Sequence, residues 1–312
     1  MSTNNNSKNL VTFVFGTRPE AIKLAPVIKA FRENKSIKTR VINTGQHKDI
    51  LEDVLKVFKI NVDKRLEIKY DKPSLTNLNC QILQKLEIEF DNFIPQLLVV
   101  QGDTATSYAS SLSAFFKKIP VAHIEAGLRT YDIYQPFPEE LNRRLISQIA
   151  TLHFAPTDLA KQNLIKDNIT NNVYITGNTV IDAVIEISKI NQKPILKNVN
   201  FEKDSLILST IHRRENWGEN LKNICFGLKK IVEKHSHIKL IFPLHPNKLV
   251  REPIKKILKN EKRVHLIEPL NYLELVYVLK YIKFVITDSG GIQEEAPTFN
   301  KPPLYNVRPV TE

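Results

Sequence analysis

The sequence predicts an α/β protein with two Rossmann-like domains, whose parallel sheets face a shared cleft. Short runs rich in β-branched residues alternate with longer stretches in which apolar residues recur every three or four positions. This alternation fades in a Lys- and Asn-rich stretch at 189–204 and then starts again. The chain has 312 residues, 42% of them apolar, which is enough material for two hydrophobic cores.

The first half of the chain carries six short apolar runs that we predict to be strands buried on both faces. They lie at residues 11–15, 40–43, 97–101, 121–124, 152–155 and 173–176. The stretch 74–93 has the pattern of an amphipathic helix that packs on a sheet. Its apolar residues, three or four positions apart, are Leu75, Leu78, Ile82, Leu86, Phe90 and Phe93.

The second half repeats this organisation. Predicted strands at 206–210, 239–242, 264–267 and 284–287 are separated by predicted helices at 219–234, 250–258 and 272–281. We place the connection near Asn178, which divides the chain into an N-terminal domain at 1–178 and a C-terminal domain at 179–312. Ligands of open α/β sheets bind at the carboxyl ends of the strands, so polar residues directly after strands are the functional candidates.

Charge and composition exclude several classes of protein. The formal net charge is +12, but basic residues never run longer than two in a row and no RNP-type motif occurs, so we expect no nucleic-acid partner. Cys80 and Cys225 form neither a disulfide framework nor a metal-ligand pattern, which predicts no metal site and a reducing, cytoplasmic location. The absence of a long apolar run predicts no membrane partner.

The turn after the first predicted strand is a candidate anion site. Gly16 permits a tight turn and Pro19 suits the first turn of a helix, which displays Arg18 at the helix N-terminus. Lys23 adds a second positive charge one turn later. The spacing differs from the dinucleotide-binding Gly-x-Gly-x-x-Gly pattern. An ordinary strand-to-helix turn with a solvated Arg is the alternative.

A second candidate anion site follows the last predicted strand. Ser289, Gly290 and Gly291 lead into a helix, so backbone N–H groups can meet a phosphate there. Only nine glycines occur in the chain, which predicts a local demand on the backbone at this pair. Glu295, about one helical turn later, has a carboxylate that can accept hydrogen bonds from ribose hydroxyls. A simple turn followed by an acidic helix is the alternative.

Three acidic residues come after predicted strands of the first domain. Asp103 and Glu125 follow strands that we expect to be neighbours, which brings both carboxylates to one edge of the sheet. Glu139 is expected to open a helix that also carries Arg143. Carboxylates placed close together are suited to proton transfer. Each of them could instead cap a helix N-terminus or interact favourably with the positive end of the helix dipole.

The second domain adds histidines at the same kind of position. His212 follows the strand at 206–210 and is followed by Arg213 and Arg214, a combination suited to phosphate oxygens. His245 follows the strand at 239–242. A polar loop with solvated cations is the alternative for this segment.

The assembled pattern resembles the non-hydrolysing UDP-N-acetylglucosamine 2-epimerase family. The likeness runs from 13 to 312 and depends on the order of eight strings. They are Phe-Gly-Thr-Arg-Pro-Glu-Ala-Ile-Lys (15–23), Gly-Gln-His (45–47), Gly-Asp-Thr (102–104), His-Ile-Glu-Ala-Gly-Leu-Arg-Thr (123–130), Pro-Glu-Glu (138–140), Ile-Thr-Gly-Asn-Thr-Val-Ile-Asp (175–182), His-Arg-Arg-Glu-Asn (212–216) and Thr-Asp-Ser-Gly-Gly-Ile-Gln-Glu-Glu-Ala-Pro (287–297).

The resemblance implies a fold like that of GT-B glycosyltransferases and the interconversion of UDP-GlcNAc and UDP-ManNAc without a cofactor. In that family UDP leaves by elimination to a 2-acetamidoglucal and then adds back. Carried over by matching motif, the catalytic residues are Asp103, Glu125, Glu139 and His212. Contacts with phosphates or sugar are implied for Arg18, Lys23, Arg143 and His212, with the diphosphate for Ser289, Gly290 and Gly291, and with the ribose for Glu295.

The resemblance also implies further properties. Gln46, His47 and His245 match a second, allosteric nucleotide-sugar site of some bacterial members, and the family suggests a homodimer. Family members continue past the Thr-Glu at which this chain stops, so we expect closing C-terminal helices to be missing and activity to be impaired. A hydrolysing epimerase, a catalytically silent UDP-sugar binder and a GT-B glycosyltransferase are the alternatives.

Overall fold

The computed structural model describes residues 9–46, 49–69, 74–299 and 304–306. The chain forms two compact units, divided between Thr179 and Val180. Each unit has a sheet in which all paired strands are parallel. The predicted fold class, α/β with two Rossmann-like parallel sheets, is confirmed.

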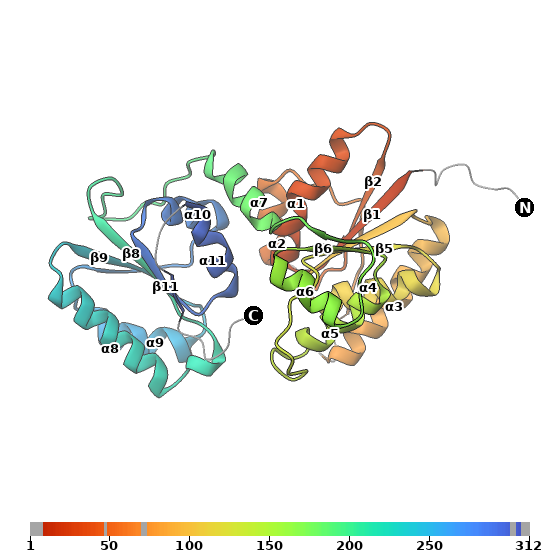
Figure 1. Cartoon of the computed structure of the whole chain (residues 1–312). Helices are drawn as coiled ribbons and strands as arrows, with labels where there is room; N and C mark the ends of the chain where they lie inside the picture. Colours follow the sequence, from red (N-terminus) through yellow and green to blue (C-terminus); the bar gives the residue numbers. More distant parts are fainter. Residues whose placement is uncertain (1–8, 47–48, 70–73, 300–303, 307–312) are drawn as a thin grey trace, which may run out of the picture. The chain divides into compact units, whose positions relative to one another are not determined.

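The first unit alternates strands and helices (Figure 1). In chain order these are β1 (Leu10–Phe15), α1 (Arg18–Glu33), β2 (Lys38–Asn43), α2 (Asp49–Val57), β3 (Lys64–Arg65), α3 (Leu75–Asn92), β4 (Leu97–Gln101), α4 (Ala105–Phe116), β5 (Val121–Ile124), α5 (Glu139–Ile149), β6 (Leu152–Ala155), α6 (Asp158–Lys166) and β7 (Val173–Ile175). The two-residue strand β3 is an addition to the six predicted strands. The strand order is β3-β2-β1-β4-β5-β6-β7. The order reverses between β1 and β4, which is where open α/β sheets bind ligands.

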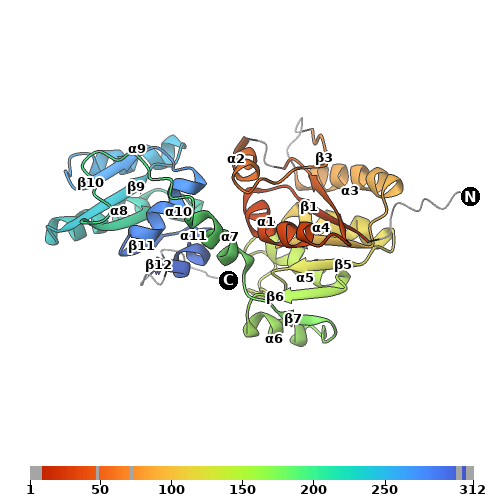
Figure 2. The same cartoon turned by 90° about the horizontal axis from the view of Figure 1, so that it is seen from above.

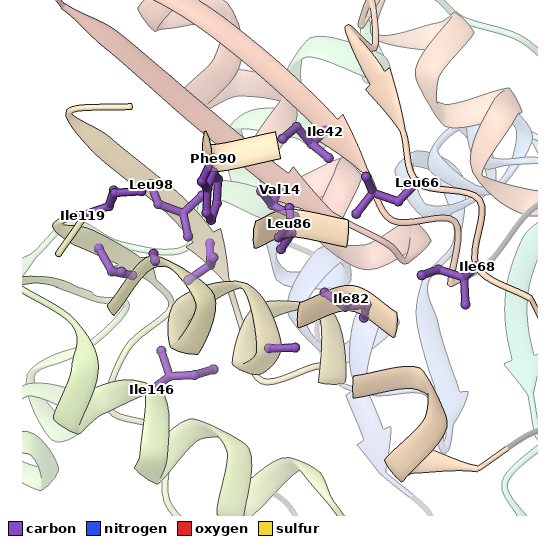
Figure 3. Packing of buried hydrophobic residues seen from close by; sticks show 14 residues of the cluster. Val14, Ile42, Leu66, Ile68, Ile82, Leu86, Phe90, Leu98, Ile119 and Ile146 are labelled. Atoms are coloured by element: carbon purple, nitrogen blue, oxygen red, sulfur yellow. The ribbon is translucent and has the colours of Figure 1, made fainter. Parts of the chain in front are cut away.

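Helices cover both faces of this sheet (Figure 2). On one face, Val14 of β1 and Leu98 of β4 belong to a buried cluster with Phe90 of α3 (Figure 3). Phe13, the neighbour of Val14, points to the other face, where its ring contacts that of Phe31 in α1 at a centroid distance of 5.3 Å. Burial on both faces explains why the strands have continuous apolar runs rather than an alternating pattern.

The second unit is smaller and is built in the same way. Its elements are α7 (Thr179–Ser188), β8 (Ser205–Thr210), the 3₁₀ turn η1 (Arg214–Asn216), α8 (Glu219–Lys234), β9 (Ile238–Pro243), α9 (Lys248–Leu258), β10 (Val264–Ile267), α10 (Tyr272–Tyr281), β11 (Phe284–Thr287), α11 (Gly290–Glu295), the 3₁₀ turn η2 (Ala296–Phe299) and β12 (Leu304–Asn306). The strand order is β10-β9-β8-β11-β12, so a short strand that the sequence did not predict forms one edge.

Buried residues alternate between the two faces of this sheet as well. Ile207 and Phe242 pack in a cluster with residues of α8 and α9, whereas Leu208 and Ile241 pack in a second cluster with residues of α10. Because β8 and β11 are paired in parallel, the loops that follow them lie at the same edge of the sheet. His212 and Ser289 are in these loops.

Two negative findings apply to the described ranges. No helix there combines the length and the hydropathy that a bilayer crossing requires. No group of three or more His, Cys, Asp or Glu residues there is arranged to hold a metal ion.

Gly127, in the loop after β5, meets two backbone constraints at once. Its φ is +95°, and an added Cβ would lie 2.2 Å from the Ala160 carbonyl oxygen. We expect Gly127→Ala to lower the free energy of unfolding by about 2–4 kcal/mol through strain and overpacking. Gly177→Ala is the matched control, because Gly177 also has a positive φ, +79°, but no described atom within 4 Å of the added Cβ. Equal losses for the two variants in urea titrations would contradict the packing argument.

Candidate functional site

Glu20 ties together the loops that follow β1 and β4. Its side chain is buried, and Oε2 accepts hydrogen bonds from the backbone N–H groups of Gly16 (3.0 Å) and Thr17 (2.7 Å). Oε1 accepts from the hydroxyls of Thr104 (2.6 Å) and Ser107 (2.9 Å) at the start of α4. Sequence reasoning gave Glu20 no role, although the Thr-x-x-Glu spacing at 17–20 is a recognised signal for a helix start.

Lys23 and Glu125 form an ion pair at this edge of the sheet. The Lys23 ammonium donates to Glu125 Oε2, and both side chains are about nine-tenths buried. Glu125 directly follows β5 in a left-handed conformation, with φ of +67°. Strain of this kind in a non-glycine residue is concentrated at functional sites. The structure therefore brings together two residues that are 102 positions apart in the sequence.

Asp103 lies in the neighbouring loop, after β4, and is held by Arg143. The Arg143 guanidinium donates from Nε to Asp103 Oδ2 at 2.9 Å, and its second partner is Glu140, 3.5 Å away. Arg143 and Glu140 are almost completely buried, whereas 19% of the Asp103 side chain is exposed. Because β4 and β5 are paired, Asp103 and Glu125 follow adjacent strands, as predicted. The role of Glu140 was missed by the sequence analysis.

The remaining candidates of the first unit lie at helix starts and in one loop. Arg18 and Glu139 are the half-buried first residues of α1 and α5. Within the described ranges, no hydrogen bond or ion pair engages the Glu139 carboxylate. Gln46 follows β2, and its side chain accepts a hydrogen bond from Thr106 at 2.9 Å. His47 lies outside the described residues.

The strand end of β8 carries the principal histidine of the second unit. His212 Nδ1 lies 3.2 Å from Oδ1 of Asp288, a fully buried residue directly after β11. The His212 side chain is 37% exposed. Burial lowers the pKa of His212, the Asp288 carboxylate opposes this effect, and Arg213 and His245 reinforce it. Asp288 was overlooked by the sequence analysis, although its position directly after a strand marked it as a candidate.

His245 lies against His212. The two imidazole rings are stacked with centroids 5.9 Å apart and planes 10° apart. The His245 ring is oriented by the backbone N–H of Asn247, which donates to Nδ1 at 3.1 Å. Two titratable rings therefore share one edge of the second sheet.

The glycine-rich turn lies at the start of α11. Ser289 is the N-terminal cap residue, Gly290 and Gly291 open the helix, and Glu295 is its buried last residue. An added Cβ at Gly291 would meet no described atom within 4 Å, and Gly291 has no positive φ. Neither a steric clash within the described residues nor a positive φ therefore requires glycine at position 291, and the predicted local demand on the backbone stays a prediction. What the missing side chain provides at this position is open space beside the helix start.

His123, in β5, is a buried histidine that we expect to make the folded protein less stable in acid. The ring is completely buried beside the Gly102 carbonyl oxygen, and burial lowers its pKa to about 3. In the unfolded chain the His123 ring is protonated below about pH 6.5, whereas in the folded chain it is protonated only below about pH 3. Acid therefore favours unfolding between these two pH values. At pH 5.5 we expect this group alone to lower the free energy of unfolding by about 1 kcal/mol relative to neutral pH.

Replacing the ring tests this effect. The slope of the free energy of unfolding against pH is proportional to the number of protons taken up on unfolding. His123→Gln should reduce that number by nearly one between pH 6.5 and 4.5. His237→Gln, at an exposed position, serves as the control and should leave the slope unchanged. An unaltered slope in His123→Gln, measured by urea titration at each pH, would show that the buried ring does not govern acid stability.

The two parallel sheets and their interleaved helices place the protein in the class of GT-B-like α/β proteins. A glycosyltransferase of Streptomyces nogalater shares this fold at 11% identity and a TM-score of 0.56, covering 93% of this chain and 79% of that one. The chain belongs to the UDP-N-acetylglucosamine 2-epimerase family, whose sequence model matches residues 29–312.

Individual relatives are similar over almost the whole chain. The UDP-N-acetylglucosamine 2-epimerases of Neisseria meningitidis and Escherichia coli K12 are 45% and 42% identical over 97% of this chain, and over 83% and 82% of their own lengths. The crystal structure of the Neisseria meningitidis enzyme bound to UDP-GlcNAc has a TM-score of 0.88, at 43% identity over 97% of this chain and 83% of that one. The Methanocaldococcus jannaschii enzyme in complex with UDP-GlcNAc and UDP has a TM-score of 0.79, at 34% identity over 96% and 84%.

Proposed function

We propose that this protein interconverts UDP-GlcNAc and UDP-ManNAc. Relatives with 42–45% identity are named for this activity, and related structures are described as bound to UDP-GlcNAc and UDP. The observation that carries the proposal to this chain is the pairing of Lys23 with Glu125 and of Arg143 with Asp103. These pairs place carboxylates and cations together at adjacent strand ends.

The reaction requires a proton to leave C2 of the sugar and to return on the other face. In our proposal a carboxylate takes the C2 proton while the bond between C1 and the UDP oxygen breaks, which yields a 2-acetamidoglucal and UDP. The reverse addition delivers a proton to the opposite face of C2 and restores the bond to UDP. Carboxylates on both sides of C2 suit this chemistry, and cations stabilise the departing diphosphate.

We assign the acid–base work to Asp103, Glu125 and Glu139. Arg143 holds Asp103, and Lys23 neutralises Glu125, so two of the three carboxylates have a fixed position and a fixed counter-charge. Glu139 lies half-buried at the start of α5, four residues before Arg143 on the same helix. Arg18, at the start of α1, is assigned to the phosphates.

In the second unit, His212 is assigned a catalytic and phosphate-binding role and Glu295 a role in ribose binding. Ser289, Gly290 and Gly291 are assigned to the diphosphate at the start of α11. The backbone N–H groups of Gly290 and Gly291 serve this role, because the Ser289 N–H donates to Thr287 Oγ1 at 2.9 Å. The open space at Gly291 supports a close approach of the phosphate. No residue in this assignment requires a metal ion or an organic cofactor.

Product analysis tests the proposal. Incubation of the protein with UDP-GlcNAc should yield UDP-ManNAc, identified by proton NMR, until the two sugars reach equilibrium. Free ManNAc together with UDP would instead support a hydrolysing epimerase. Binding of UDP in calorimetry without any turnover would support a silent UDP-sugar binder, and either result would overturn the proposal.

We also propose a homodimer in the cytoplasm. Neighbouring helices α3, α4 and α5 carry large apolar side chains that are 36–67% exposed in the single chain. They are Ile88, Phe115, Phe116, Leu141 and Leu145. Light scattering is expected to give the mass of a dimer, and Phe116→Glu is expected to shift it toward a monomer. A monomeric parent protein would overturn this proposal.

Allosteric activation by a second UDP-GlcNAc is proposed for Gln46, His47 and His245. Turnover of UDP-ManNAc should then rise when small amounts of UDP-GlcNAc are added. Turnover that is independent of added UDP-GlcNAc would refute this assignment.

A further inference from the structure

Asp288 organises the loop that follows β8. Its carboxylate accepts hydrogen bonds from the backbone N–H groups of His212 (3.0 Å to Oδ2) and Arg213 (2.8 Å) and from the side-chain amide of Asn216 (2.9 Å). The residue is fully buried. A buried carboxylate with this many donors is held in one orientation, which fixes the oxygen that lies next to the His212 ring.

The geometry determines which nitrogen of His212 carries the proton. Nδ1 lies 3.2 Å from Oδ1 of Asp288, and a carboxylate surrounded by N–H donors acts only as an acceptor. A lone pair on Nδ1 would face this carboxylate oxygen, so the contact favours the neutral tautomer that is protonated at Nδ1 and has its lone pair on Nε2. His245 is oriented in the opposite way, since its Nδ1 accepts from Asn247 and its proton belongs on Nε2.

We propose that Asp288 is a positioning residue that fixes the tautomer of His212 and makes Nε2 the ring atom that exchanges a proton beside the UDP-sugar. The inference rests on the proposed function for the role of His212 in catalysis. The tautomer itself follows from the second unit alone, because every residue involved lies within it.

The charged groups around His212 influence its pKa, and therefore the pH at which the ring becomes protonated. Asp288 and Glu215 favour the protonated ring, whereas Arg213 and the stacked His245 disfavour it. Burial has the largest effect and lowers the pKa. Removal of the Asp288 charge should therefore lower the pKa of His212 further, and the pH profile of activity should shift in the acid direction.

The decisive experiment is ¹⁵N NMR of the whole protein labelled at its eight histidines. The spectra are recorded without substrate, above the His212 pKa, and the His212 signals are assigned from the His212→Gln variant. The parent protein should show a protonated Nδ1 and an unprotonated Nε2. Asp288→Asn should invert this pattern, because the amide of the new side chain can donate to Nδ1. A parent protein with protonated Nε2, or an unchanged tautomer in Asp288→Asn, would overturn the inference.

Asn216→Ala separates positioning from a purely structural role. It removes one hydrogen bond to the same carboxylate but leaves the contact between Asp288 and His212 in place. We expect Asn216→Ala to keep the tautomer and the acid limb of the pH profile. Asp288→Asn should lower kcat by about 10²-fold or more, the range for a misplaced acid–base group. Equal changes of tautomer, pH profile and kcat in both variants would show that Asp288 only stabilises the loop that follows β8.

The two proposals can fail separately. If the parent protein converts UDP-GlcNAc but has protonated Nε2 on His212, only the tautomer inference fails. If the tautomer is as expected but no UDP-ManNAc forms, the proposed function fails together with the catalytic role of Nε2, and the fixed tautomer stands.

Discussion

Replacing Asp103 with Asn, Glu125 with Gln or Glu139 with Gln is expected to slow epimerisation by about 10²–10⁴-fold each. Each change keeps the size of the side chain but removes a group that can take up or release a proton. Affinity for UDP, measured by calorimetry, should change far less, because the diphosphate is assigned to other residues. Incorporation of deuterium at C2, followed by NMR in deuterated water, should fall in parallel with turnover.

Asp158→Asn is the matched control for these variants. Asp158 is an exposed acid at the start of α6 in the same unit, and its replacement should leave turnover unchanged. A variant of Asp103, Glu125 or Glu139 that retains parental turnover would remove that residue from the acid–base set. The order of the three losses would also rank the carboxylates, which the ion pairs alone do not do.

Glu20→Ala is expected to cause the largest loss of stability in the first unit, about 3–5 kcal/mol. The change removes the acceptor of three donors, the N–H groups of Gly16 and Thr17 and the hydroxyl of Thr104. The Ser107 hydroxyl keeps a second acceptor, the Gln101 carbonyl oxygen at 2.6 Å. Buried donors that lose their partners carry a desolvation penalty that the parent protein avoids. Chemical denaturation followed by circular dichroism measures the loss.

Two further variants on the same helix make the result specific. Glu33→Ala, at the exposed end of α1, should change stability by less than about 0.5 kcal/mol. Glu20→Gln should lie between the parent and Glu20→Ala, because one oxygen remains as an acceptor. Our account of the network would be refuted by a Glu20→Ala protein that is as stable as Glu33→Ala.

The fold was largely predictable because its strands are buried on both faces. Such strands have continuous apolar runs that are easy to separate from the amphipathic helices between them. The strands β3 and β12, which have two and three residues, are too short to produce a recognisable pattern. Their positions at sheet edges are set by pairing with β2 and β11 rather than by their own sequence.

Most residues of the candidate site could be predicted from the sequence, but the residues that they contact could be predicted less well. Asp103 and Glu125 were found because they directly follow strands, and the paired strands bring them to one edge. The partnership of Glu125 with Lys23 depends on tertiary structure, so no local pattern announces it. Glu20 and Asp288 had local signals, a Thr-x-x-Glu spacing and a place after a strand, but their buried hydrogen bonds became evident only in three dimensions. The roles assigned to these residues remain predictions.

The strand order has a consequence for how the protein folds. β1 pairs with β4, so Val11 is aligned with Leu97, and a long loop must close before the centre of the first sheet can form. A nascent chain on the ribosome therefore cannot form the central part of this sheet until β4 and β5 have been synthesised. The ion pair between Lys23 and Glu125 spans this connection and also β4 and β5. We expect its formation to mark a late step of folding, so that a folding intermediate with β1 and β2 already paired would still lack the acid–base site.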